Sequence, residues 1–189
     1  MSAFEFVLVA FSIIIGFGVS EILASWGQQI RARDRLAPFP LQIAATALVL
    51  IVHLSFLWGL WMSRGIEWTF PLYLLFAAMA CVLGLCAHVM TVDTTPGAEG
   101  LREQYFRNSR PAYALFALVP LLVVAFTFTS GVSPGGTAYN LLRIFVSGLL
   151  ASLAWFRNER YHWVGLAILW LIILGAMGSL AFRLGEDAA

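Results

Sequence analysis

Apolar residues fall into six long runs along the chain, and short segments rich in glycine, proline and arginine separate these runs. Each run has about the 20 residues that an α-helix needs to cross the hydrocarbon core of a bilayer. The runs predict transmembrane helices near residues 4–29, 41–62, 71–91, 111–130, 138–156 and 162–183. Because a helix satisfies its backbone hydrogen bonds internally, as lipid demands, the pattern predicts an all-α, polytopic integral membrane protein.

The connections between these runs are too short to fold separately, so residues 1–189 are expected to form a single transmembrane domain. The longest connection has room for a surface helix over residues 98–109, with Leu101, Tyr105 and Asn108 on one face and arginines around it. We expect such a helix to lie on anionic lipid, and the alternative is a docking site for a cytosolic partner.

Composition supports a lipid environment. Hydrophobic residues make up 61% of the chain and charged residues only 11%, whereas a soluble domain has about a quarter charged residues. A chain of 189 residues cannot bury this much apolar surface in a water-soluble core, so the expected surrounding is the lipid bilayer. The net charge of +1 gives no reason to expect a nucleic-acid partner.

The distribution of arginine predicts the orientation. All eleven basic residues are arginine, and eight of them lie in the first, third and fifth connections. These eight are Arg31, Arg33, Arg35, Arg102, Arg107, Arg110, Arg157 and Arg160. The opposite side has only Arg64 and Arg183. Because short cytoplasmic loops are enriched in arginine and lysine, the odd-numbered connections are expected in the cytoplasm and both termini outside.

Polar side chains inside the predicted spans are the candidate functional residues, because a charge at the centre of a membrane helix costs about 2.5–3.5 kcal/mol. They are Glu5, Glu21, His53, His88, Asn140 and Arg143. Glu21 is the most suggestive, since it lies in the inner half of the first span. Its carboxylate is suited to line an aqueous path or to take up protons, and the alternative is a hydrogen bond within a helix interface.

Small residues recur beside Glu21. Ser12, Gly16 and Ser20 are spaced four residues apart, a pattern that lets another helix approach closely. Gly18 and Glu21 belong to a neighbouring polar strip of the same helix. The first span therefore combines a predicted helix-packing surface with an acidic residue.

The histidines and Arg143 each have two interpretations. His53 and His88 suit proton relay, haem ligation or hydrogen bonding between helices, but their different expected depths count against a shared haem. His162 is expected at the level of the lipid headgroups. Arg143, beside Asn140, is expected either to pair with Glu5 or to extend toward the outer headgroups, and an anion site is the functional alternative.

The opening Phe4-Glu-Phe6, followed by Ile14-Ile-Gly-Phe-Gly-Val-Ser20, resembles the start of uncharacterised small multi-pass bacterial inner-membrane proteins. The resemblance covers only the first span. It implies a bacterial inner-membrane location and carries over no functional residue.

Three function classes follow from the sequence. No nucleotide-binding loop, metalloprotease motif or nucleophile elbow is present, so the sequence gives no catalytic site and leans away from an enzyme. The first class is an oligomeric channel or transporter for ions, protons or a small solute, with Glu21 on its path. The second is a non-catalytic subunit or scaffold of a larger membrane complex. The third is a redox protein that binds haem or quinone through His53 or His88; otherwise no cofactor or metal is predicted.

Overall fold

The computed structural model describes residues 3–131 and 136–179, and within them it contains six α-helices and no strand. The helices are α1 (Ala3–Arg31), α2 (Pro40–Met62), α3 (Phe70–Met90), α4 (Leu101–Ser130), α5 (Gly136–Trp155) and α6 (Glu159–Ser179). All six are long and apolar enough to cross a membrane. The all-α class and the six predicted spans are thereby confirmed as helices, and the end of the sixth span, residues 180–183, lies outside the described residues.

Proline and glycine set several of the helix boundaries. Pro40 and Pro71 lie in the first turns of α2 and α3, where the missing N–H leaves no hydrogen bond unmade. Gly131 ends α4 in the left-handed conformation, with φ of 69°, which a glycine adopts without strain.

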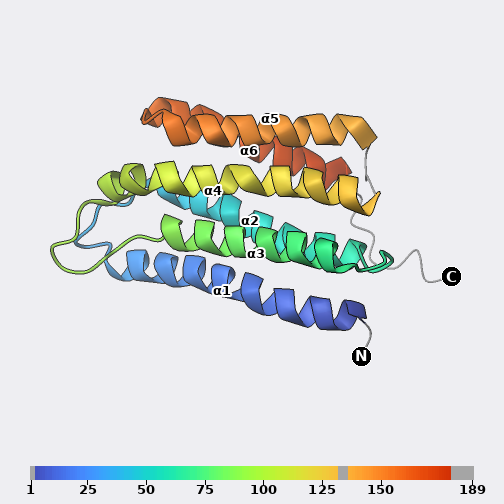
Figure 1. Ribbon diagram of the computed structural model, residues 1–189. Helices are drawn as coiled ribbons and strands as arrows, with labels where there is room; N and C mark the ends of the chain where they lie inside the picture. Colours follow the sequence, from blue (N-terminus) through green and yellow to red (C-terminus); the bar gives the residue numbers. More distant parts are fainter. Residues whose placement is uncertain (1–2, 132–135, 180–189) are drawn as a thin grey trace.

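The helices run alternately up and down and form a bundle (Figure 1). Helix α4 packs mainly against α3 and α5, and α3 packs in turn against α1. Helix α2 contacts α1, α3, α4 and α6, and α6 also contacts α5. Helix α1 therefore lies at one edge of the bundle, with α5 and α6 at the other.

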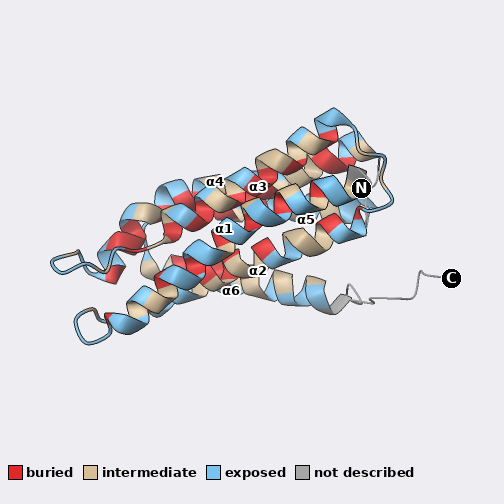
Figure 2. Cartoon of the chain, turned by 90° about the horizontal axis from the view of Figure 1, so that it is seen from below, coloured by how far each residue is buried: buried red, intermediate tan, exposed pale blue. Residues whose placement is uncertain are grey.

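Apolar side chains fill the interior. Buried residues gather on the helix faces that point toward one another, and exposed residues cover the outside (Figure 2). At one level of the bundle, the ring of Phe76 packs against Phe11, Phe56, Trp68 and Phe126 from three other helices and the α2–α3 connection. Large apolar side chains also point outward on every helix, as expected for surfaces that face lipid.

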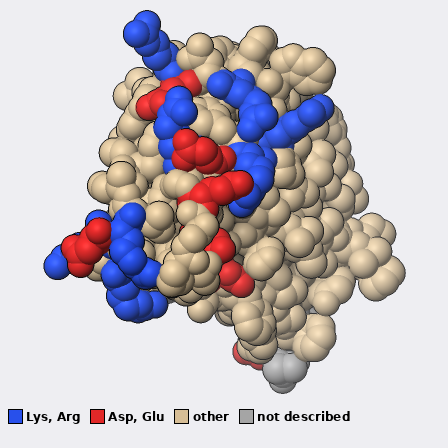
Figure 3. All heavy atoms as spheres, turned by 90° about the vertical axis from the view of Figure 1, so that its left-hand side faces the viewer, with Lys and Arg blue, Asp and Glu red and all other residues tan. Residues whose placement is uncertain are grey.

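One end of the bundle carries most of the charge. The connections α1–α2, α3–α4 and α5–α6 all lie there, whereas α1 begins and α6 ends at the opposite end. Arginine and acidic side chains crowd this surface, which we call the arginine end (Figure 3). The eight arginines that predicted the orientation from the sequence thus share one end of the molecule.

The region predicted as a separate surface helix is the beginning of α4. The helix starts at Leu101 and continues through Pro111 and Pro120 to Ser130. Pro111 was expected to begin the fourth span, because proline favours the first turn of a helix. The buried side chains of Tyr105, Phe106 and Tyr113 hold the two parts together, and their packing offsets the one hydrogen bond that Pro111 removes. The face expected to lie on lipid therefore packs against the protein itself.

Candidate functional site

Glu21 and His88, two of the polar residues singled out in the sequence, lie next to each other on the outer surface of α1 and α3. The Nδ1 atom of His88 is 3.4 Å from Oε1 of Glu21. Both side chains are open to the surroundings, at 46% for Glu21 and 69% for His88. His88 is in the last turn of α3, so the pair lies toward the arginine end. The bundle thus presents a carboxylate and an imidazole together on a surface that is otherwise largely apolar.

A second imidazole is fully enclosed where α2 packs against α1. His53, near the middle of α2, is 0% exposed, and its Nδ1 donates a hydrogen bond to the Val49 carbonyl oxygen at 2.8 Å. Because a carbonyl only accepts, Nδ1 carries the proton and Nε2 of the neutral ring carries a lone pair. Nε2 has no hydrogen-bond partner among the described residues.

Gly18 is the residue that makes room for this imidazole. A methyl group at Gly18 would lie 2.3 Å from Nε2 and 2.8 Å from Cδ2 of His53. The ring edge therefore rests on the backbone of α1, where only a glycine fits. This packing leaves no space for a metal at Nε2, and His88 belongs to a different surface, so the geometry does not favour a haem held by these two histidines.

The stripe of small residues on α1 is not covered by any of the described residues. Ser12, Gly16 and Ser20 are exposed, and a methyl group at Gly16 would meet no atom within 4 Å. In the described part of the chain, Gly18 is thus in close contact with α2, whereas Ser12, Gly16 and Ser20 are open. Glu21 is also exposed on α1, and it lies toward α3, where it meets His88.

A hydrogen-bonded chain that the sequence did not reveal joins α4 to α6. The hydroxyl of Tyr105 lies 2.9 Å from that of Tyr113 and 2.7 Å from Nδ1 of His162. Nε2 of His162 lies 2.8 Å from the carbonyl oxygen of Phe156. His162 is 0% exposed, so its ring is enclosed by protein, and its depth at the level of the headgroups stays a prediction.

The order of donors in this chain follows from the carbonyl at its end. The Phe156 oxygen only accepts, so Nε2 of His162 donates to it and Nδ1 of the neutral ring accepts from Tyr105. The Tyr105 hydroxyl then accepts from Tyr113. Each bonding group is satisfied, which is typical of buried polar residues that stabilise a helix contact.

Two buried glutamines hold the connections at the arginine end. The Gln104 amide accepts from the Asp93 N–H and donates to the carbonyl oxygens of Asp93 and Glu99, all at 2.7 Å. Gln42 donates to the Met90 carbonyl oxygen. The backbone N–H and the hydroxyl of Thr95 both donate to the Asp93 carboxylate, and these bonds lower the pKa of Asp93. None of these residues stands out in the sequence, because each partner is a backbone group or a loop residue.

Arg143 bonds within its own helix. Its Nη1 donates to Oδ1 of Asn140 at 2.7 Å, and Thr127 on α4 lies 3.4 Å from the same oxygen. Helices α1 and α5 do not contact each other. The predicted pair between Arg143 and Glu5 is therefore not formed.

Of these groups, the Glu21–His88 pair is the one suited to chemistry with its surroundings. Its two side chains are accessible, and they bring a carboxylate and an imidazole within 3.4 Å of each other. The chain of Tyr105, Tyr113 and His162 is enclosed, and each of its groups is engaged by another. The accessible pair and the exposed stripe of small residues on the same helix form the candidate functional site, which we call the α1 face (Ser12, Gly16, Ser20, Glu21 and His88).

Comparison with known proteins gives no relative: no family model, no curated protein and no solved structure matches the chain.

Proposed function

We propose that the protein is an oligomeric membrane channel or transporter for protons, ions or a small solute, and that its path runs between copies along the α1 face. The observation that carries this proposal is the accessible Glu21–His88 pair beside an uncovered stripe of small residues. An acid and an imidazole exposed to lipid are costly, whereas water or a second protein surface removes much of that cost.

The packing of the bundle favours a path between copies over one within a copy. The core between the helices is filled by apolar side chains, including Phe11, Ile15 and Leu83. Buried polar groups such as Gln104 and His162 are held by fixed hydrogen bonds. An uncovered face of small residues, by contrast, suits close contact between two transmembrane helices.

The location that accompanies this proposal is a bacterial inner membrane with the arginine end in the cytoplasm. The clustering of eight arginines at one end supports it, because cytoplasmic loops carry an excess of such residues. The surroundings and partners are then the lipid bilayer and further copies of the chain.

A second candidate is a non-catalytic subunit of a larger membrane complex. The satisfied hydrogen bonds of Tyr105, Tyr113 and His162 favour it, since they describe a rigid structural bundle. In that case the α1 face meets a different membrane protein. A redox protein that uses His53 and His88 is less well supported than either, because the His53 ring packs against Gly18 and leaves no space for a metal at Nε2.

Proton flux into proteoliposomes tests the transport role. We expect Glu21→Gln to reduce flux at least tenfold, because an amide cannot exchange the proton of the acid. Glu67→Gln, which removes an equal charge from the exposed α2–α3 connection, is the control and should leave flux unchanged. Flux that survives Glu21→Gln, or its absence from the unmodified protein with every cation tried, would contradict the proposal.

Disulfide trapping tests the contact between copies. In a Cys81→Ser background, a cysteine replacing Gly16 should cross-link two copies in membranes under mild oxidation, whereas one replacing the exposed Leu171 on α6 should not. Cys86 is buried and stays in place. Equal cross-linking at both positions, or at neither, would contradict assembly through the α1 face. Flux without cross-linking would leave the transport role standing and remove the contact.

A further inference from the structure

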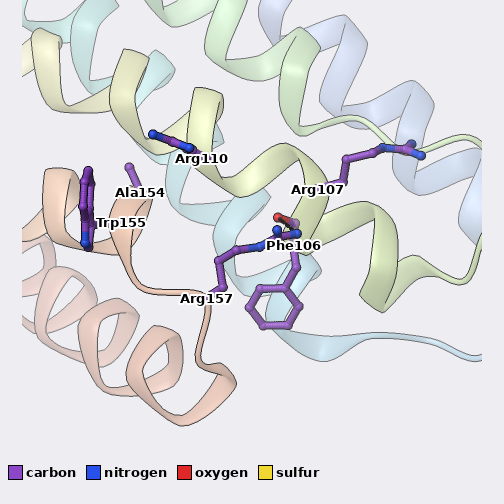
Figure 4. A pocket seen from close by; sticks show the side chains of 6 residues that line it. All are labelled: Phe106, Arg107, Arg110, Ala154, Trp155 and Arg157. Atoms are coloured by element: carbon purple, nitrogen blue, oxygen red, sulfur yellow. Dashed lines mark hydrogen bonds between the residues drawn. The ribbon is translucent and has the colours of Figure 1, made fainter.

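A hollow at the arginine end lies between α4 and the end of α5, away from the α1 face. Its volume is about 310 Å³, and it is lined by Phe106, Arg107, Arg110, Ala154, Trp155 and Arg157 (Figure 4). Three of the six residues are therefore arginines, and the rest are apolar or aromatic. Among the described residues, no acidic side chain lines it.

The three arginines have different partners. Arg107 forms an ion pair with Glu99 and points away from the other two (Figure 4). The guanidinium of Arg110 lies over the ring of Trp155, 5.8 Å from its centroid. Nη2 of Arg157 donates to the carbonyl oxygen of Phe106 at 3.0 Å. In the part of the chain that the structure describes, neither Arg110 nor Arg157 has a carboxylate partner.

These two guanidinium groups thus leave most of their N–H donors unused beside one hollow. A nearby arginine shows the contrast: Arg102, on the same helix, is neutralised by Glu159 at 2.9 Å. A guanidinium has five donors in a planar fork that matches the oxygens of a phosphate, and two such groups at one site suit a phosphate, which offers more acceptor oxygens than a carboxylate.

The aromatic wall indicates where that phosphate comes from. Trp155 is 73% exposed at the last residue of α5, and Phe156 beside it is also exposed. Tryptophan at the end of a transmembrane helix lies at the level of the headgroups, with its ring against the glycerol and upper acyl region. A headgroup phosphate in the hollow would therefore have its lipid tail beside Trp155 and Phe156.

We infer that this hollow binds the phosphate of an anionic phospholipid, with Arg110 and Arg157 as its ligands and Trp155 as the wall against the lipid body. Basic hollows between transmembrane helices on the cytoplasmic side recognise such headgroups. This inference concerns a site separate from the α1 face and does not depend on the transport role.

Native mass spectrometry of the protein released from nanodiscs tests this site. In nanodiscs of phosphatidylcholine with one fifth phosphatidylglycerol, we expect retained phosphatidylglycerol on the unmodified protein. The double variant R110Q/R157Q should retain it at least about tenfold less. The control R35Q/R160Q removes two exposed arginines from the same end and should retain it as the unmodified protein does.

Each other outcome overturns the inference. Equal loss in both double variants would mean that general surface charge attracts the lipid. Inorganic phosphate that protects the detergent-solubilised protein from heat as strongly as phosphatidylglycerol would make the hollow a site for a soluble anion. If R110Q/R157Q unfolds, the single variant R110Q tests the site instead, because the Arg110 guanidinium lies over the ring of Trp155. Unchanged retention of phosphatidylglycerol in R110Q would exclude Arg110 as a ligand.

Discussion

Helices α1 and α4 are similar in length, with 29 and 30 residues, yet they place their polar side chains in opposite ways. Helix α4 buries Gln104 and Tyr105 in hydrogen bonds to other elements. Helix α1 turns Ser12, Ser20 and Glu21 outward. The difference follows from their positions, because α4 has α3 and α5 on its two sides, whereas α1 lies at the edge of the bundle.

The role of a polar residue in a membrane helix therefore depends on which helix, if any, packs against it. On α4 the surroundings are protein, and a polar group there stabilises a contact. On the outward side of α1 the residues that the structure describes supply no neighbour, so the same kinds of residue are available to water, lipid or a second protein. Substitutions on the two helices should therefore affect different properties.

The largest effect is expected from Gln104→Leu on α4. It removes three hydrogen bonds and leaves the Asp93 N–H without its acceptor, so we expect a loss of about 2–3 kcal/mol in the free energy of unfolding. Unfolding in mixed micelles with increasing SDS measures it. The matched variant on α1, Gln28→Leu at an exposed position, should change stability by less than about 0.5 kcal/mol. Equal losses of stability in the two variants would contradict the different roles of polar residues on α4 and α1.

A similar contrast is expected within α1 itself. Gly18→Ala places a methyl group against the His53 ring and should destabilise the protein by about 2 kcal/mol, as overpacking of a core does. Gly16→Ala, two residues away on the open side, should be neutral in the same assay. The double variant Gly18→Ala/His53→Ala should be more stable than the sum of its single variants predicts, and strict additivity would show that the two residues do not touch.

Tyr105→Phe should have a somewhat smaller effect, about 1–2 kcal/mol. It removes the middle hydroxyl of the chain and leaves the Tyr113 hydroxyl without its acceptor and Nδ1 of His162 without its donor. Tyr113→Phe removes only the last donor and should cost about half as much. A larger effect for Tyr113→Phe in thermal unfolding, followed by tryptophan fluorescence, would mean that the order of donors is incorrect.

Glu21→Gln should leave the stability of one copy within about 0.5 kcal/mol of the unmodified value, because exposed ion pairs contribute little. The expected effect is on flux alone. A loss of stability comparable with that of Gln104→Leu would show that Glu21 is a structural residue. Its side chain would then stabilise the fold, as the buried polar side chains of α4 do.

The smallest effect concerns pH. Hydrogen bonds from Thr95 hold the pKa of Asp93 below its ordinary value of 3.8, so the charged carboxylate stabilises the folded state above that pH. This contribution is lost as the pH falls through the lowered pKa. The unmodified protein should therefore melt slightly higher than Asp93→Asn at pH 7, and the gap should close as the pH falls below the lowered pKa of Asp93. A gap that widens in acid would contradict this sign.

The sequence predicted where the helices lie along the chain better than which residues of different helices meet. Runs of apolar residues located all six spans, and only the start of α4 was missed, because the polar segment before Pro111 resembles a loop. Glu21, His53 and His88 were recognised as unusual because a single charged residue stands out in lipid. Which residues meet depends on the rotation and neighbours of each helix, so neither the Glu21–His88 pair nor the burial of His162 could be predicted. The expected Glu5–Arg143 pair failed for the same reason, since equal depth does not make two helices adjacent.

The fit of His53 onto Gly18 also has a consequence for assembly. A slip of α2 along α1 by one helical turn, 5.4 Å, would bring the imidazole against Ile14 or Ile22 instead of a glycine. The contact thus specifies a single register for two helices that follow each other in the chain and are synthesised before α3 to α6. Because neighbouring segments meet early during synthesis, we expect this register to form before α3 to α6 are available, so that the later helices assemble on a pair that is already aligned.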